Sequence, residues 1–110
     1  MRKTAPVKKP LVFEWDTGNK EKNVKKHNVQ NTETEEVFVN DPVILPDRTH
    51  SQKEERYFAF GVTNKGRKLI VSFTLRGEQQ ERIRPIMSRD QSKKERAYYQ
   101  EEKSEVTKEK

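Results

Sequence analysis

The sequence contains no cysteine and no long apolar run. Without cysteine, the chain has no disulfide, no thiolate metal site and no cysteine nucleophile. No stretch approaches the roughly 18–20 apolar residues that a membrane-spanning helix requires. The basic N-terminus also lacks the apolar region of a secretory signal. We therefore expect a cytoplasmic protein that does not bind a membrane.

Motifs of common enzyme chemistry are missing as well. The four glycines are dispersed, so there is no glycine-rich phosphate loop. The two histidines, His27 and His50, have no partner at the spacing of a zinc site, and no spacing indicates a serine triad. Ordinary hydrolases, kinases and dehydrogenases are therefore disfavoured, and we expect neither a metal nor a cofactor.

Charge is abundant: 38% of the residues are charged, 29% are hydrophobic, and the formal net charge is +6. The positive charge is concentrated in residues 56–100, which contain eleven basic and four acidic residues. Clustered cations gain affinity for polyanions by releasing counterions from phosphates. Charge alone fits a nucleic-acid-binding surface and an ordinary solvated surface equally well.

The length of 110 residues favours one domain. Residues 1–10 are basic, contain two prolines and have little to bury, which predicts a disordered tail. The apolar pattern of a folded domain covers residues 11–100. Residues 101–110 are charged, so we expect a frayed tail there, with the last helix fading near Glu102.

The N-terminal part predicts a strand and two helices. Residues 11–15 form a strand-like run. Asp16 can cap a helix over residues 19–27, and Asn28 can end that helix in the left-handed conformation.

A capping box of Thr32 and Glu35 predicts the start of the second helix. Asn40 and Asp41 before Pro42 end it, because proline disfavours helix in the residue that precedes it. A short strand over residues 43–45 and a polar loop over residues 46–55 follow.

Two alternating runs, residues 56–63 and 68–76, predict a β-hairpin around the glycine-bearing turn at 64–67. One face is expected to be an apolar core that helices cover, and the other to be small, polar and open. We assign to the first face Phe58, Phe60, Val62, Leu69, Val71, Phe73 and Leu75, and to the second Tyr57, Ala59, Gly61, Ile70, Ser72, Thr74 and Arg76.

The C-terminal part predicts one more strand and one more helix. Gly77 ends the hairpin, and residues 82–89 form the next strand. Ser92 and Glu95 form a second capping box, which starts a terminal helix. Helices segregated from an antiparallel sheet make the fold α+β.

Seven segments resemble, in the same order, the BrnT toxins of type II toxin–antitoxin systems. The match that they define covers roughly residues 11–100. They are Phe-Glu-Trp-Asp at 13–16, residues 23–27 and 36–42, the run that begins Glu-Glu-Arg-Tyr at 54–61, Val-Ser-Phe-Thr at 71–74, and residues 83–89 and 93–99.

The resemblance implies a RelE-like ribonuclease fold, in which an N-terminal strand and two helices pack on an antiparallel sheet with a C-terminal helix. It also implies a BrnA-like antitoxin that wraps the toxin and carries a ribbon-helix-helix DNA-binding domain. Operator DNA would then be bound only through the antitoxin complex.

The sequence departs from the family pattern at three places. Residues 1–10 are a basic extension. Asn28 stands where glycine is common, a mild change because asparagine tolerates the left-handed conformation. Pro85 stands inside a strand where an aliphatic residue is usual. Because proline donates no ladder hydrogen bond, this strand should lie at an edge of the sheet or be bulged.

RNA cleavage without a metal needs the ribose 2′-oxygen to attack the adjacent phosphate in line, and fixed cations near the phosphoryl oxygens lower the barrier. Arginine suits this role because its planar fork binds two phosphate oxygens. Resemblance and position together favour Arg56, Arg76 and Arg89 as catalytic residues. Arg84 and Tyr98 are candidates for RNA binding. The alternative for each arginine is a surface ion pair, and for the tyrosine it is packing.

A general base must exchange its proton near the working pH, which arginine does not do. Glu55, beside Arg56, and His27 are both candidates, and the sequence does not choose between them. We therefore predict a metal-independent endoribonuclease that inhibits translation and growth. The alternatives are a non-catalytic RNA-binding or degenerate module, and a gyrase-directed toxin on the same scaffold.

Overall fold

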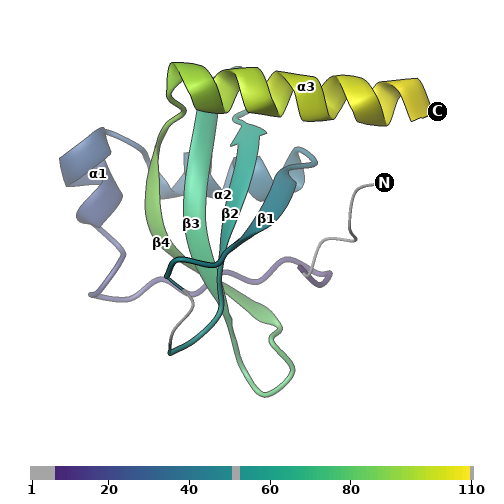
Figure 1. Cartoon of the computed structure of the whole chain (residues 1–110). Coiled ribbons are helices and arrows are strands. Elements are labelled where there is room, and N and C mark those ends of the chain that lie inside the picture. Colours follow the sequence, from purple (N-terminus) through teal and green to yellow (C-terminus); the bar gives the residue numbers. More distant parts are fainter. Residues whose placement is uncertain (1–6, 51–52, 110) are drawn as a thin grey trace.

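The computed structural model describes residues 7–50 and 53–109. Four antiparallel strands form one sheet in chain order, preceded by two helices and followed by a third (Figure 1), so the α+β prediction is confirmed. The elements are α1 (Lys22–His27), α2 (Asn31–Val39), β1 (Val43–Asp47), β2 (Arg56–Val62), β3 (Lys68–Arg76), β4 (Arg82–Asp90) and α3 (Lys93–Glu109).

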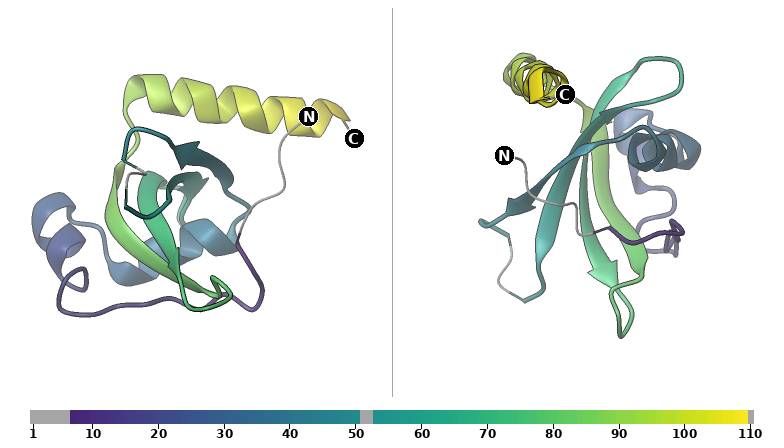
Figure 2. Two further views of the ribbon diagram at one scale, coloured as in Figure 1. Left: turned by 60° about the horizontal axis from the view of Figure 1, so that its bottom comes forward. Right: turned by 90° about the vertical axis from the view of Figure 1, so that its right-hand side faces the viewer.

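The helices cover both faces of the sheet. α1 and α2 lie on one face, and α3 crosses one end of the other (Figure 2). We call these the α2 face and the α3 face. Within the described residues, no helix combines the length and the apolarity needed to cross a membrane.

The larger core lies between α2 and the sheet. Phe38 of α2 packs edge-on against Phe73 of β3, with ring centroids 5.0 Å apart. Gly61 of β2 permits a close approach of α2, because a Cβ atom there would lie 2.9 Å from Cγ1 of Val37. The core also contains Val29, Ala59, Leu69, Val71, Leu75 and Ile83.

The predicted hairpin is confirmed, but the predicted faces are wrong for β2. Ala59 pairs with Val71 and Phe60 with Ile70. Ala59 therefore shares the α2 face with Val71, while Phe60 lies with Ile70 on the α3 face. The last paired residues are Val62 and Lys68, so the connecting loop has five residues, and the Thr63 N–H donates to the Arg67 carbonyl within it. This is one residue more than the predicted turn, and a one-residue change of register moves side chains to the opposite face.

Strand β4 confirms the expectation for Pro85. The strand lies at the end of the strand order, and the pairing slips by one residue between Ser72–Met87 and Phe73–Pro85. Residues 11–15, predicted as a strand, form instead an extended segment with one parallel bridge between Phe13 and Ile83.

The start of α1 differs from the prediction. The helix begins at Lys22, and Asp16 accepts the N–H of Gly18 at 2.8 Å, which stabilises a turn before the helix. The amide of Asn19 holds this turn on β4 by donating to the Pro85 carbonyl at 2.8 Å. Asn28 adopts the predicted left-handed conformation, with φ 53°.

The start of α2 also differs. Glu33 accepts the backbone N–H of Gln30 at 3.0 Å, so the capping glutamate lies two residues before the predicted one. The carboxylate of Glu35 instead accepts the indole N–H of Trp15 at 2.8 Å. Asn40 ends the helix as expected.

The capping box at the start of α3 is confirmed. The Ser92 N–H donates to Glu95 at 2.7 Å, and the Glu95 N–H donates to Ser92 Oγ at 3.3 Å. The helix continues to Glu109, beyond the point near Glu102 where the sequence predicted it to fade.

The predicted N-terminal tail lies partly outside the described residues, which begin at Val7. Val7 packs against the core on the α2 face, and Lys8 donates to the Gln79 carbonyl. The division of the chain into two tails and a domain stays a prediction.

Candidate functional site

Four arginines of the sheet strands lie at one end of the α3 face, and three of them are candidate site residues; the fourth, Arg82, pairs with Arg76. Thr74 of β3 pairs with Arg56 of β2 and with Arg84 of β4, so these three residues form one row across the sheet. Arg76 lies two residues along β3 from Thr74 and therefore on the same face. Neighbouring strands are about 4.8 Å apart, which places the Cα atoms of Arg56 and Arg84 within about 10 Å. We call Arg56, Arg76 and Arg84 the basic end.

Arg89 lies on the same face but at the other end of the sheet. It pairs with Ile70, four residues from Thr74, which corresponds to about 13 Å along a strand. The structure therefore brings Arg56, Arg76 and Arg84 together and places Arg89 beside the start of α3.

Carboxylates bind the guanidinium groups of Arg76 and Arg89. Arg76 donates to Glu54 through two nitrogens at 3.0 and 3.1 Å, and Arg89 donates to Glu95 at 2.8 and 2.9 Å. The hydrogen bond from Arg89 is the main reason that the pKa of Glu95 lies below its usual value. A phosphate would have to displace these carboxylates to bind the same guanidinium forks.

Arg84 ties the N-terminal segment to β4. It donates to Asp16, and this hydrogen bond is the main cause of the lowered pKa of that carboxyl. Glu14 lies 3.5 Å from Arg84 and 3.8 Å from Arg76, so one carboxylate spans two members of the basic end. With 16% of its side chain exposed, Arg84 also has a packing role.

The two candidate bases lie far apart. Glu55 lines, with Arg56, a hollow of about 340 Å³ at the basic end, and it accepts the Tyr57 hydroxyl at 2.7 Å. That hydrogen bond raises the pKa of Tyr57. His27 ends α1, which packs against β4 on the α2 face, and its carbonyl accepts a hydrogen bond from Arg67. The structure does not bring His27 together with the basic end.

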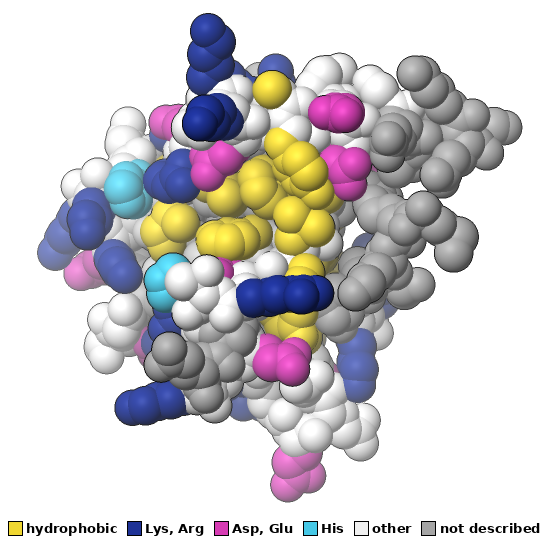
Figure 3. Space-filling view, in the orientation of Figure 1, with side chains coloured by type: hydrophobic (Ala, Val, Ile, Leu, Met, Phe, Trp, Pro, Cys, Tyr) yellow, Lys and Arg dark blue, Asp and Glu magenta, His cyan; other side chains and the backbone are white. Residues whose placement is uncertain are grey.

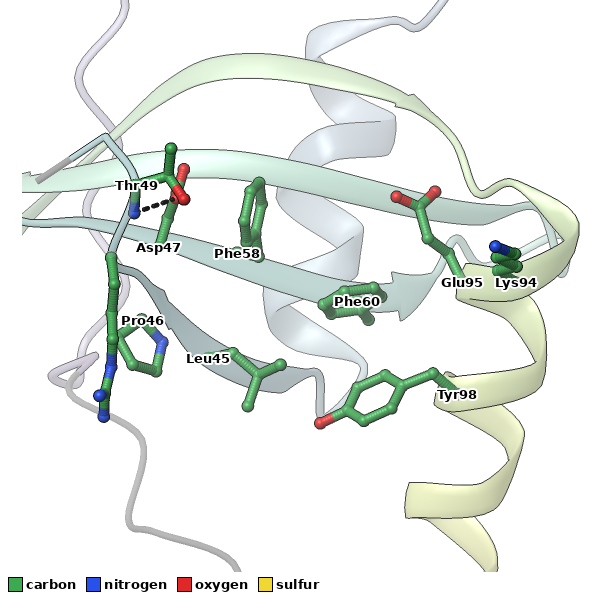
Figure 4. A pocket seen from close by; sticks show the side chains of 10 residues that line it. Leu45, Pro46, Asp47, Thr49, Phe58, Phe60, Lys94, Glu95 and Tyr98 are labelled. Carbon is green, nitrogen blue, oxygen red and sulfur yellow. Dashed lines mark hydrogen bonds between the residues drawn. The ribbon is translucent and has the colours of Figure 1, made fainter.

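An apolar pocket lies in the middle of the α3 face, below α3. Figure 3 shows hydrophobic side chains gathered there, with charged side chains around them. The pocket has a volume of about 520 Å³, and its floor includes Leu45, Phe58 and Phe60. Tyr98 of α3 lies over this floor, with its ring centroid 5.4 Å from that of Phe60 (Figure 4). Its neighbour Tyr99 is buried in the core.

The sequence patterns did not predict a role for His50. Its Nδ1 lies 2.9 Å from Oδ2 of Asp47, the last residue of β1, which pairs with Arg56 across the sheet. The signal in the sequence is an acidic residue at the end of a strand, followed three residues later by histidine. Within the described residues, no group of three or more histidine, aspartate or glutamate side chains is placed to hold a metal ion.

Fold and surface define a small basic α+β protein, and a family model specifies its class as ribonuclease toxins of type II toxin–antitoxin systems. That model, described as ribonuclease toxin BrnT of a type II toxin–antitoxin system, matches residues 15–95. The chain therefore belongs to the BrnT family.

A solved structure agrees with this fold. The crystal structure of the Brucella abortus ribonuclease toxin BrnT matches with a TM-score of 0.52 and 20% sequence identity, over 76% of this chain and 96% of the other. A comparison with curated proteins found no significant match.

Proposed function

We propose that this chain is a metal-independent endoribonuclease toxin that cleaves RNA in the cytoplasm, inhibits translation and growth, and is neutralised by a BrnA-like antitoxin. The observation that carries the proposal is the basic end, where Arg56, Arg76 and Arg84 share one end of one sheet face. Membership of a family of ribonuclease toxins supplies the reaction class.

The reaction starts when the ribose 2′-oxygen attacks the adjacent phosphate. Negative charge then grows on the phosphoryl oxygens, and Arg56 and Arg76 stabilise it because β2 and β3 hold both residues at the same end of one sheet face. RNA displaces Glu54 from Arg76 at small cost, because exposed ion pairs contribute about 0–1 kcal/mol. Their side chains are 42% and 41% exposed. Arg84 and Tyr98 contact flanking nucleotides, and Arg89 binds a more distant phosphate.

Purified protein is tested on single-stranded RNA in the presence of EDTA. We expect cleavage by the wild type and a loss on the order of 100-fold or more in Arg56→Ala and Arg76→Ala. Lys65→Ala removes the same charge from an exposed turn residue at the far end of the hairpin and should cleave normally. Cleavage that EDTA abolishes would contradict the metal-free mechanism. RNA binding without scission, or inhibition of gyrase supercoiling instead, would contradict the proposed activity.

Type II systems pair each toxin with an antitoxin, and the apolar pocket below α3 is a surface that an antitoxin could cover. Co-expression with the neighbouring reading frame should give a tight complex and restore growth. If the isolated chain does not arrest growth, or the neighbouring product does not relieve the arrest, the toxin–antitoxin assignment fails.

A further inference from the structure

We infer that His50, held by Asp47, is the group that exchanges the proton during RNA cleavage at the basic end. This inference rests on the proposed ribonuclease function and assigns its missing base. Three observations support it. Asp47 fixes the imidazole ring of His50, this ring is exposed, and His50 shares a hollow with Arg56.

Asp47 fixes the position of His50. Oδ2 of Asp47 lies 2.9 Å from Nδ1 of the ring, while Oδ1 accepts the backbone N–H groups of Thr49 at 3.2 Å and His50 at 3.4 Å. One carboxylate therefore binds both the ring and the backbone that carries it. A carboxylate at Nδ1 selects the tautomer with a proton on that nitrogen, which leaves the lone pair on Nε2.

Asp47 and His50 differ in exposure. A base must be open to the substrate, whereas the residue that positions it can be buried. The side chain of Asp47 is 6% exposed, and that of His50 is 60% exposed. The carboxylate is thus held inside the protein, whereas the imidazole is open to a substrate. Imidazole is also the side chain that most readily exchanges a proton near neutral pH.

His50 shares a hollow with a cation that can bind phosphate. The hollow has a volume of about 360 Å³, and its charged lining consists of Lys53, Glu54 and Arg56. Arg56 belongs to the basic end, and Glu54, which also lines the hollow, pairs with Arg76 of the basic end at 3.0 Å. A phosphate held by Arg56 would place its ribose neighbour within this hollow.

The candidates from the sequence fit less well. Glu55 is engaged by the Tyr57 hydroxyl at 2.7 Å. His27 lies at the end of α1, on the other side of the sheet from the basic end. His50 combines the required chemistry with the required position.

His50 accepts one proton during cleavage, and water donates the other. Nε2 of His50 takes the proton of the 2′-hydroxyl while the 2′-oxygen–phosphorus bond forms and the bond from phosphorus to the 5′-oxygen breaks. The leaving 5′-oxygen takes a proton from water. The products are a 2′,3′-cyclic phosphate and a 5′-hydroxyl, and His50 then returns its proton to solvent.

The test compares His50→Gln with wild type and with His27→Gln, which makes the same change on the α2 face. Cleavage of single-stranded RNA is measured in EDTA from pH 5 to 8, and binding is measured with a fully 2′-O-methylated RNA that cannot be cleaved. We expect the His50 variant to bind normally but to cleave about 100-fold more slowly or worse. The wild-type rate should rise with pH in this range, and the variant should lose that rise.

Two further variants separate catalysis from structure. His50→Ala should regain activity when imidazole is added to the buffer, which a purely structural residue would not do. Asp47→Asn should alter the pH profile more than the binding of methylated RNA.

Wild-type cleavage and pH dependence in His50→Gln would overturn the inference and leave the ribonuclease proposal intact. An equal loss of binding and cleavage would also overturn it, because His50 would then only hold RNA. If the wild type itself does not cleave, the proposed function fails first.

Discussion

Arg89 and Glu95 join the end of β4 to the first turn of α3 through two hydrogen bonds of 2.8 and 2.9 Å. The same carboxylate accepts the Ser92 N–H, so it starts the helix and anchors it to the sheet. Arg89 therefore has a structural task at one end of the α3 face.

Glu95→Gln should weaken this junction. We expect the free energy of unfolding to fall by about 1 kcal/mol, because a partly exposed ion pair is lost and the capping hydrogen bond from the Ser92 N–H no longer has a charged acceptor. Urea denaturation of the variant and of Glu101→Gln, an exposed site on the same helix, measures the difference. Equal midpoints for the two variants would show that the junction contributes nothing.

Acid should destabilise the protein through its paired carboxyls. The pKa values of Asp16, Asp90 and Glu95 lie below their ordinary values, chiefly because of hydrogen bonds from Arg84, Arg67 and Arg89.

A lowered pKa in the folded state means that the folded state holds fewer protons than the unfolded one. The resulting stability is complete above the ordinary values of 3.8 and 4.5, and it is lost as the pH falls through the lowered ones. Urea titrations from about pH 6 to pH 2 should show this loss, and Glu95→Gln should show a smaller one. A pH-independent free energy of unfolding over this range is the contrary result.

Gly61→Ala should destabilise the contact between α2 and β2. The new methyl group would lie 2.9 Å from Cγ1 of Val37, and overpacking of this kind costs about 1–3 kcal/mol. The double variant with Val37→Ala should lose less stability than the sum of the two single variants, because the smaller side chain makes room. Simple additivity in thermal or urea unfolding would mean that the two side chains do not compete for space.

Glu54→Gln should strengthen RNA binding. The glutamate occupies the fork of Arg76, so its neutralisation removes a competitor for phosphate, and we expect affinity about two- to five-fold higher. Glu21→Gln makes the same charge change at an exposed site, the residue directly before α1. Titration of methylated RNA at fixed salt tests both. An equal gain in the two variants would indicate a general charge effect instead of competition at Arg76.

Local patterns predicted the elements well. The alternating runs around the β2–β3 turn, Gly77 after β3 and the Ser92–Glu95 box all act within a few residues, and each is found as predicted. Pro85 is also a local signal. Because proline has no backbone N–H, its strand must lie at an edge of the sheet or contain a bulge, and β4 has both features.

Features that depend on distant partners were not predictable in the same way. The start of α2 depends on Glu35 being bound to Trp15, twenty positions away. The hairpin faces have a local cause, one extra loop residue, which the alternating pattern does not specify. The ion pair of Arg76 with Glu54 joins residues 22 positions apart, so the sequence could name the arginine but not its partner. The candidacy of His50 depends on the end of β1 at Asp47 and on the pairing of Asp47 with Arg56, neither of which a local pattern specifies.

The extended segment beside β4 has a consequence for solubility. Its backbone pairs with Ile83 through Val12 and Glu14, at 2.8 Å in both directions, and so covers part of one open edge of the sheet. At the opposite edge, β1 has five residues and includes Pro46, which has no N–H to offer. Both edges are thus poor templates for strands of other molecules, and the sheet resists aggregation by edge-to-edge pairing.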